Sequence, residues 1–258
     1  MKLLGVGPRD VVSLARYQRR THDLHRPLLV TGLLAEQLAK ELRAGGDPSL
    51  VRTSGDPAEA ALFVRVVAGA ATAEDERLFR SATRALVPVV AVQTADRPVR
   101  LPYVLAEDVV RCPPGSGFPL AEIADRIAAA LGEAGAPLAA SLPVLRDAVT
   151  HRRAADGALS AAAFSALGAA SGPKLPVLAL AQARMLSDVR LASGADSGGD
   201  QKAAAQELAV PLALSLGTGL AARELVRRLP RRARVLDAAV AAGVTFALAA
   251  VFRRLPRL

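Results

Sequence analysis

The chain has 258 residues and a formal net charge of +9 at pH 7; 52% of its residues are hydrophobic and 22% are charged. This composition excludes an intrinsically disordered chain and a fibrous repeat. The single cysteine, Cys112, excludes an internal disulfide and any zinc site made of cysteines alone. The opening residues lack the apolar stretch of a secretory signal, so we expect a cytoplasmic protein.

Residues 1–26 precede the first expected strand, and among them we expect a short basic helix from Pro8 to His22. Short apolar runs that alternate with helical patterns then predict a βαβ architecture. The five expected strands are Pro27–Thr31, Ser49–Thr53, Ala61–Val67, Leu86–Val92 and Pro102–Leu105. The expected helices among them are Leu33–Arg43, Thr72–Arg84 and Leu120–Leu131, and Thr72 to Asp75 resembles an N-cap followed by acidic residues of a first turn. Several strands are nearly unbroken runs of Val and Leu, which is typical of parallel strands buried on both faces.

The strand pattern ends at about Leu142. Four apolar helical stretches follow, at 142–167, 175–193, 201–229 and 233–255. The segment Gly132 to Pro137 is expected to separate two domains, residues 27–135 and 138–258. We therefore predict an α/β domain with a mostly parallel five-stranded sheet, followed by an all-α helical bundle rich in Ala and Arg.

The junction of the first strand and the first helix lacks the residues of a phosphate-binding loop. A P-loop has the pattern G-x-x-x-x-G-K-[ST] at this place. Here Gly32 remains, but Gln37 stands at the second glycine, Leu38 at the lysine and Ala39 at the magnesium-binding hydroxyl. Without these groups neither the phosphates nor the metal ion has its usual ligands, and Glu36 adds a negative charge. We expect no bound nucleotide, no metal ion and no other cofactor.

Three later segments extend the comparison with GTPases. Arg52-Thr53-Ser54-Gly55 stands where D-x-x-G is expected, Gln93-Thr94-Ala95-Asp96 where N-K-x-D is expected, and Leu105-Ala106-Glu107 near S-A-K. Only Asp96 is kept from the guanine-reading motif. In order and spacing, residues 27–131 resemble an Era-like small GTPase domain with a degenerate Walker A motif and a shortened switch I region. The alternative is a flavodoxin-like or Rossmann-like α/β domain.

The second half resembles the YcjF-like helical domain that is fused to bacterial GTPases or encoded beside them. The resemblance rests on Gln182 to Leu186, Ala221 to Leu225, and Gly243 to Leu248 within the apolar stretch 238–252. It implies a membrane-linked, GTPase-associated module, and it carries over no catalytic residues.

Membrane contact and a soluble Ala-rich bundle are both open for the C-terminal segment. Its two most apolar runs, 208–222 and 238–252, are shorter than the roughly 20 residues that usually span a bilayer. Basic side chains between and after the runs suit an anionic membrane surface or a protein partner. They are Arg227, Arg228, Arg231, Arg232, Arg234, Arg253 and Arg254. Few aromatic residues accompany them, which disfavours nucleic acid.

The sequence assembles no set of nucleophile, base and stabilising group, so we expect no enzymatic activity. His22 and His25 have no further metal ligand nearby, and Cys112 has no activating base. The first hypothesis is a non-catalytic pseudo-GTPase that acts as an interaction or scaffold protein for an intact bacterial GTPase at or near the inner membrane. One alternative is an enzyme or ligand-binding domain with a non-nucleotide ligand near Thr31, Gly32, Thr94 and Asp96. Another is a membrane-surface adaptor that uses residues 208–258.

Overall fold

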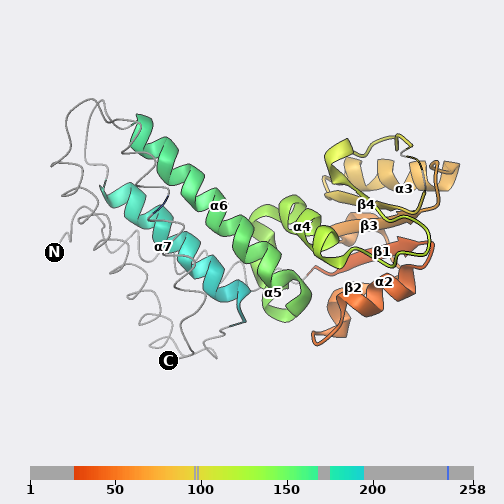
Figure 1. Ribbon diagram of the computed structural model, residues 1–258, viewed down its shortest axis with the longest axis horizontal. Coiled ribbons are helices and arrows are strands. Elements are labelled where there is room, and N and C mark those ends of the chain that lie inside the picture. The colour runs from red at the N-terminus through yellow and green to blue at the C-terminus, as the bar shows by residue number, and fades with distance from the viewer. Residues whose placement is uncertain (1–25, 96, 98, 168–174, 195–242, 244–258) are drawn as a thin grey trace. The chain divides into compact units, whose positions relative to one another are not determined.

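The computed structural model describes residues 26–95, 97, 99–167, 175–194 and 243 (Figure 1). The chain divides into two compact units. Described residues up to Val149 belong to one unit and those from Thr150 onward belong to the other. The first unit contains the sheet, and we refer to it as the α/β unit.

The α/β unit is built on a parallel sheet of five strands in the order β2-β1-β3-β4-β5. The strands are β1 (Leu28–Gly32), β2 (Val51–Arg52), β3 (Leu62–Val67), β4 (Val89–Gln93) and β5 (Val109–Arg111). The predicted parallel sheet is thereby confirmed. This strand order is that of flavodoxin-like doubly wound sheets, in which ligands bind outside the carboxyl ends of the strands where the order reverses. In this chain that position lies between β1 and β3.

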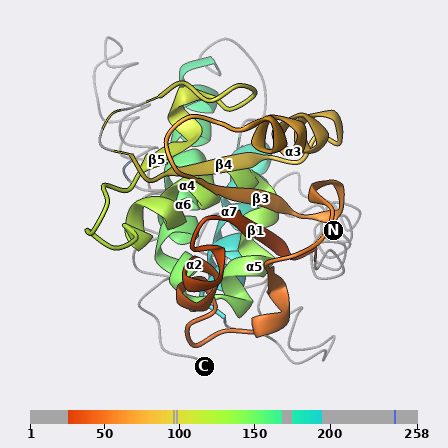
Figure 2. The same ribbon diagram turned by 90° about the vertical axis from the view of Figure 1, so that its right-hand side faces the viewer.

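Helices cover both faces of the sheet (Figure 2). Helix α3 (Ala73–Arg84) packs on one face against β3 and β4. Helices α2 (Ala35–Leu42) and α4 (Leu120–Leu131) contact the strands on the opposite side. Successive strand side chains point to opposite faces, so both sets must be apolar when both faces are covered. Every residue of β4 is buried, as the unbroken apolar run predicts.

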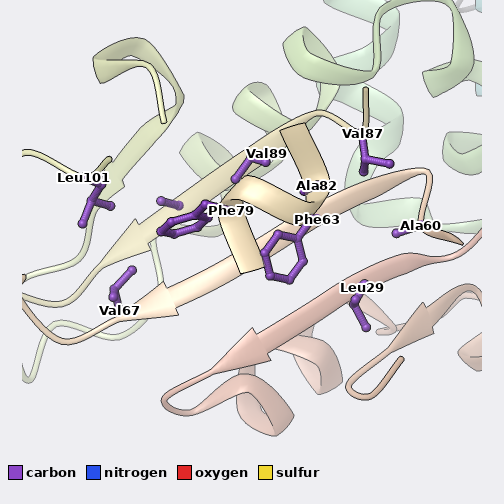
Figure 3. Close-up of a cluster of buried hydrophobic side chains, with 10 residues drawn as sticks. Leu29, Ala60, Phe63, Val67, Phe79, Ala82, Val87, Val89 and Leu101 are labelled. Carbon is purple, nitrogen blue, oxygen red and sulfur yellow. The ribbon is translucent and has the colours of Figure 1, made fainter. Parts of the chain in front are cut away.

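The core beneath α3 is small but closely packed (Figure 3). Phe63 of β3 and Phe79 of α3 meet edge to face, with their ring centroids 6.2 Å apart. Smaller side chains fill the space around them: Leu29, Ala60, Val67, Ala82, Val87, Val89, Ala91 and Leu101. A chain with six Phe and no Trp thus uses two of its rings at the centre of this face.

The strand predicted at Pro102–Leu105 is wrong. In the described residues between 94 and 108, which connect β4 to β5, there is no α-helix, and the connection ends in the short 3₁₀ helix η3 (Ala106–Asp108). Leu101 is apolar because it packs into the core under α3, and Pro102 has no N–H to give to a neighbouring strand. Leu105 to Glu107 therefore precede the fifth strand, so their comparison with the S-A-K motif, which needs a position after that strand, is also wrong.

Helix α3 has well-defined signals at both ends. Thr72 and Asp75 form a capping box at its start, where the sequence predicted an N-cap. Its end is less usual, because Leu86 adopts the left-handed conformation (φ 57°) that favours glycine, and its side chain is 90% exposed. The Leu86 amide donates to the Thr83 carbonyl and the Val87 amide to the Ala82 carbonyl, so this strained residue closes the helix.

We expect Leu86→Gly to stabilise the α/β unit by about 1 kcal/mol. Relief of the left-handed strain exceeds the extra backbone entropy of glycine in the unfolded state, and almost no buried area is lost. Urea denaturation followed by circular dichroism measures the change. Leu105→Gly is the control: Leu105 is also exposed but has φ −69°, so the same substitution there should lower stability.

Beyond the sheet the described chain is helical. The expected boundary segment forms η4 (Gly132–Ala134) and α5 (Gly135–Ser141). Helices α6 (Pro143–Leu167) and α7 (Leu175–Ala192) match two of the four predicted helical stretches, and the division between the units falls within α6. The stretches predicted at 8–22, 201–229 and 233–255 lie outside the described residues, except for Gly243. Among the described helices, none has the length and hydropathy needed to cross a bilayer.

Within the second unit, α6 and α7 approach closely at Gly157. A Cβ atom there would lie 2.8 Å from Cγ of Met185 and would overlap its Sδ. One turn earlier on α6, Arg153 lies beside Asp188 of α7. Both side chains are largely buried, and Nε of Arg153 is 3.6 Å from Oδ2 of Asp188. Ala154, Met185 and Leu186 form the apolar contact beside them.

Candidate functional site

The junction of β1 and α2 is tight. β1 ends at Gly32 and α2 begins at Ala35, so only Leu33 and Leu34 connect them. Gly32 has φ 102°, and a Cβ atom there would overlap the carbonyl oxygen of Val66 on β3. The Leu33 amide donates a hydrogen bond of 3.1 Å to the same oxygen. The β1–α2 connection therefore packs directly against the end of β3. In doubly wound sheets, ligands bind at this position.

The residues at the P-loop positions lie inside helix α2. Gln37 is exposed, whereas Leu38 and Ala39 are completely buried beneath the helix. In a P-loop the residues between the two glycines form the cradle of N–H groups that surrounds the phosphates. Here two of the four, Ala35 and Glu36, already belong to the helix. A lysine at position 38 would consequently lie in the core, not at the carboxyl edge.

The charge at the start of α2 is negative. The Glu36 carboxylate lies in the first turn and accepts a hydrogen bond of 2.7 Å from the Thr53 hydroxyl. The carboxylate suits the positive end of the helix dipole and would repel a phosphate at that end. The junction thus combines a short connection, a close approach to β3 and an acidic first turn.

A polar network fills the carboxyl end of β3 on the α3 side. The Arg65 guanidinium donates to Asp75 Oδ1 from Nε at 2.7 Å and from Nη2 at 2.6 Å, and to the Thr31 hydroxyl from Nη1 at 3.1 Å. The other Asp75 oxygen accepts from the Thr72 amide and hydroxyl. Burial favours the neutral carboxyl, but these hydrogen bonds and the Arg65 charge outweigh it and lower the pKa of Asp75. Thr31, a candidate ligand residue, therefore already has an internal partner.

We expect Asp75→Asn to destabilise the α/β unit by about 2 kcal/mol at pH 7, because it removes the charge that balances the largely buried Arg65. The lowered pKa of Asp75 means that its carboxylate stabilises the fold above the ordinary value of 3.8, and that this contribution is lost as the pH falls through the native pKa. The gap between wild type and variant should therefore narrow below about pH 4. Urea midpoints across pH measure this, and Asp125→Asn on the exposed face of α4 should show no such gap.

The end of β4 is also used internally. The buried Gln93 side chain donates to the carbonyls of Gly69 and Val99 and accepts from the Val99 amide, at 2.7 to 3.3 Å. The Thr94 amide and hydroxyl both donate to the Val67 carbonyl. Through these hydrogen bonds, Gln93 links Val99 in the β4–β5 connection to Gly69 in the segment after β3. Asp96, the remaining guanine-motif residue, lies outside the described residues.

The outer surface of α3 was missed by the sequence analysis. Arg77, Arg80 and Arg84 follow one another at helical spacing, and two shallow clefts of about 540 and 680 Å³ lie among them. The Arg80 guanidinium lies over the ring of Tyr103, 5.2 Å from its centroid. The i, i+3, i+7 spacing of the arginines was available in the sequence; the approach of Tyr103 depends on the path of the β4–β5 connection.

Cys112, which the sequence leaves without an activating base, makes an internal contact. The buried Cys112 thiol donates to the Gly117 carbonyl at 3.0 Å. Within the described part of the chain no three His, Cys, Asp or Glu side chains are grouped to hold a metal ion. His22, His25 and the C-terminal arginines Arg227, Arg228, Arg231, Arg232, Arg234, Arg253 and Arg254 lie outside it.

Comparison with known proteins does not extend these observations to a family. No protein-family model matches the chain, and searches of curated proteins and of solved structures found no match.

Proposed function

We propose that this chain is a non-catalytic interaction protein whose α/β unit is related to small GTPases but has lost nucleotide binding. The relation to small GTPases rests on the sequence resemblance, and the observation that supports the loss of nucleotide binding is the β1–α2 junction. Its two-residue connection is drawn against Val66, Leu38 and Ala39 are buried, and Glu36 occupies the first turn of α2. Each feature removes a group or a space that a polyphosphate with its magnesium ion would need.

The proposed partner is an intact GTPase, which would dock on the α/β unit. The arginine-rich C-terminal segment would keep the complex close to an anionic membrane surface, since nine arginines against Glu224 and Asp237 lie between residues 223 and 258. This part of the proposal rests on the sequence resemblance. The alternative of a membrane-surface adaptor has the same basis, because residues 208–258 lie outside the described residues except for Gly243.

A small-ligand site at the carboxyl edge receives no support from the described residues. Thr31 accepts from Arg65, Thr94 donates to Val67, and the backbone of Gly32 lies against the Val66 carbonyl. These contacts hold the edge together.

We expect isothermal calorimetry with GTP, GDP and ATP in the presence of Mg²⁺ to show no binding tighter than about 1 mM. The full chain is used, so that the C-terminal segment is present. Micromolar binding of any of the three nucleotides would overturn the proposed loss of nucleotide binding. Binding of an intact GTPase from the same bacterium, loaded with either GDP or a GTP analogue, would then support the scaffold role.

A further inference from the structure

We propose that the outer surface of α3 binds an acidic helical segment of a protein partner. The surface, here called the α3 surface, consists of Arg77, Arg80, Arg84, Leu86 and Tyr103. The proposal rests on the proposed function, because it names the chemistry of the partner that a non-catalytic interaction protein would bind.

The arginines of the α3 surface have no acidic partner in the described part of the chain. No hydrogen bond or ion pair to a described carboxylate engages Arg77, Arg80 or Arg84. Arg77 and Arg84 are seven positions apart, which is roughly 10 Å along the helix. Guanidinium groups bind carboxylates through paired hydrogen bonds, so a row at this spacing is complementary to carboxylates repeated on one face of another helix.

Two residues of the α3 surface combine a strained backbone conformation with a large, exposed side chain. Leu86 has φ 57° with 90% of its surface exposed, and Tyr103 has φ 62° with 51% exposed. Leu86 directly follows Ala85, which lines one cleft, and Tyr103 lines the other. Glycine or asparagine would fit these backbone positions with less strain and less exposed apolar area. Contact with a partner explains why large side chains stand at both.

A protein segment fits this surface better than nucleic acid. Arg80 already covers one face of the Tyr103 ring, and Leu86 offers an apolar contact that phosphates cannot use. Arginine and tyrosine beside an apolar residue are the composition of protein interfaces. The described residues supply no acidic partner, and the segments outside them contain more basic than acidic residues, which favours another chain as the source of the acidic groups.

The test uses the full chain and a fluorescein-labelled helical peptide of about 15 residues, with glutamates at i, i+3 and i+7 and a leucine one turn beyond. Fluorescence anisotropy at low ionic strength should show saturable binding that weakens with added salt. The variant Arg80→Gln/Arg84→Gln should weaken binding by about tenfold. The control Arg26→Gln/Arg52→Gln removes the same charge from exposed arginines outside the α3 surface and should change binding by less than about twofold.

Leu86→Gly distinguishes the loss of a contact with the peptide from a loss of folding. We expect this variant to unfold at higher urea concentration than wild type and yet to bind the peptide about threefold more weakly, which loss of structure cannot explain. Equal effects of the two double substitutions, or unchanged binding by both Leu86→Gly and Arg80→Gln/Arg84→Gln, would overturn the proposal. So would tighter binding of an oligothymidine of about 12 nucleotides that depends on Arg80 and Arg84. None of these results bears on nucleotide binding, which calorimetry decides separately.

Discussion

Gly32→Ala is expected to destabilise the α/β unit by about 4 kcal/mol. Gly32 has φ 102°, which an L residue rarely adopts, and its Cβ would overlap the carbonyl oxygen of Val66. That oxygen belongs to the backbone of the buried strand β3 and accepts the Leu33 amide, so it cannot move aside without disturbing the sheet. The strain and the clash therefore act together, and the β1–α2 connection must shift to relieve them.

Gly69→Ala is the matched control for Gly32→Ala. Gly69 also has positive φ, 83°, but nothing lies within 4 Å of the place its Cβ would occupy. It should therefore show only the conformational cost, about 1 kcal/mol. Urea denaturation of both variants gives the difference between them, which measures the close approach to β3. If the two variants were equally stable, the approach of Gly32 to Val66 would not be a rigid feature of the junction.

The elements with strong local signals were predicted well. The alternation of leucine, isoleucine and alanine with polar residues gave both ends of α4, and Thr72 with Asp75 gave the start of α3. The strand β3 was placed within one residue, since an unbroken apolar run between turn residues is buried from both sides. The strand predicted at Pro102–Leu105 was wrong because Leu101 and Val104 pack on the core from a connection. The sequence alone does not distinguish an apolar residue buried from a connection from one in a paired strand.

The candidate site was predicted in its chemistry and not in its geometry. The replacement of a lysine by Leu38 and of a hydroxyl by Ala39 was evident from the sequence. That both side chains are buried was not, because it depends on which face of α2 packs against β1 and β2. The internal use of Thr31 by Arg65 was also hidden, since the two residues are 34 positions apart. Contacts of that kind follow from strand order, which local patterns do not determine.

Leu38→Lys, which places a lysine where a P-loop would have its cation, is expected to destabilise the α/β unit by about 4 kcal/mol and to leave ATP binding undetectable. Leu38 is completely buried. A lysine there loses the apolar contact of leucine and places its ammonium group in the core, or shifts α2 to reach water. Urea denaturation measures the stability, and calorimetry with ATP and Mg²⁺ measures the binding.

Gln37→Lys is the control, because Gln37 is exposed on the same helix and a lysine there should cost less than about 0.5 kcal/mol. The pair of variants distinguishes two explanations of the proposed loss of nucleotide binding. If the loss depends on the missing lysine alone, Leu38→Lys folds well and binds ATP. If it depends on the packing of α2 over this position, neither variant binds ATP and only Leu38→Lys is unstable. The burial of Leu38 and Ala39 together with the two-residue connection favours the second outcome.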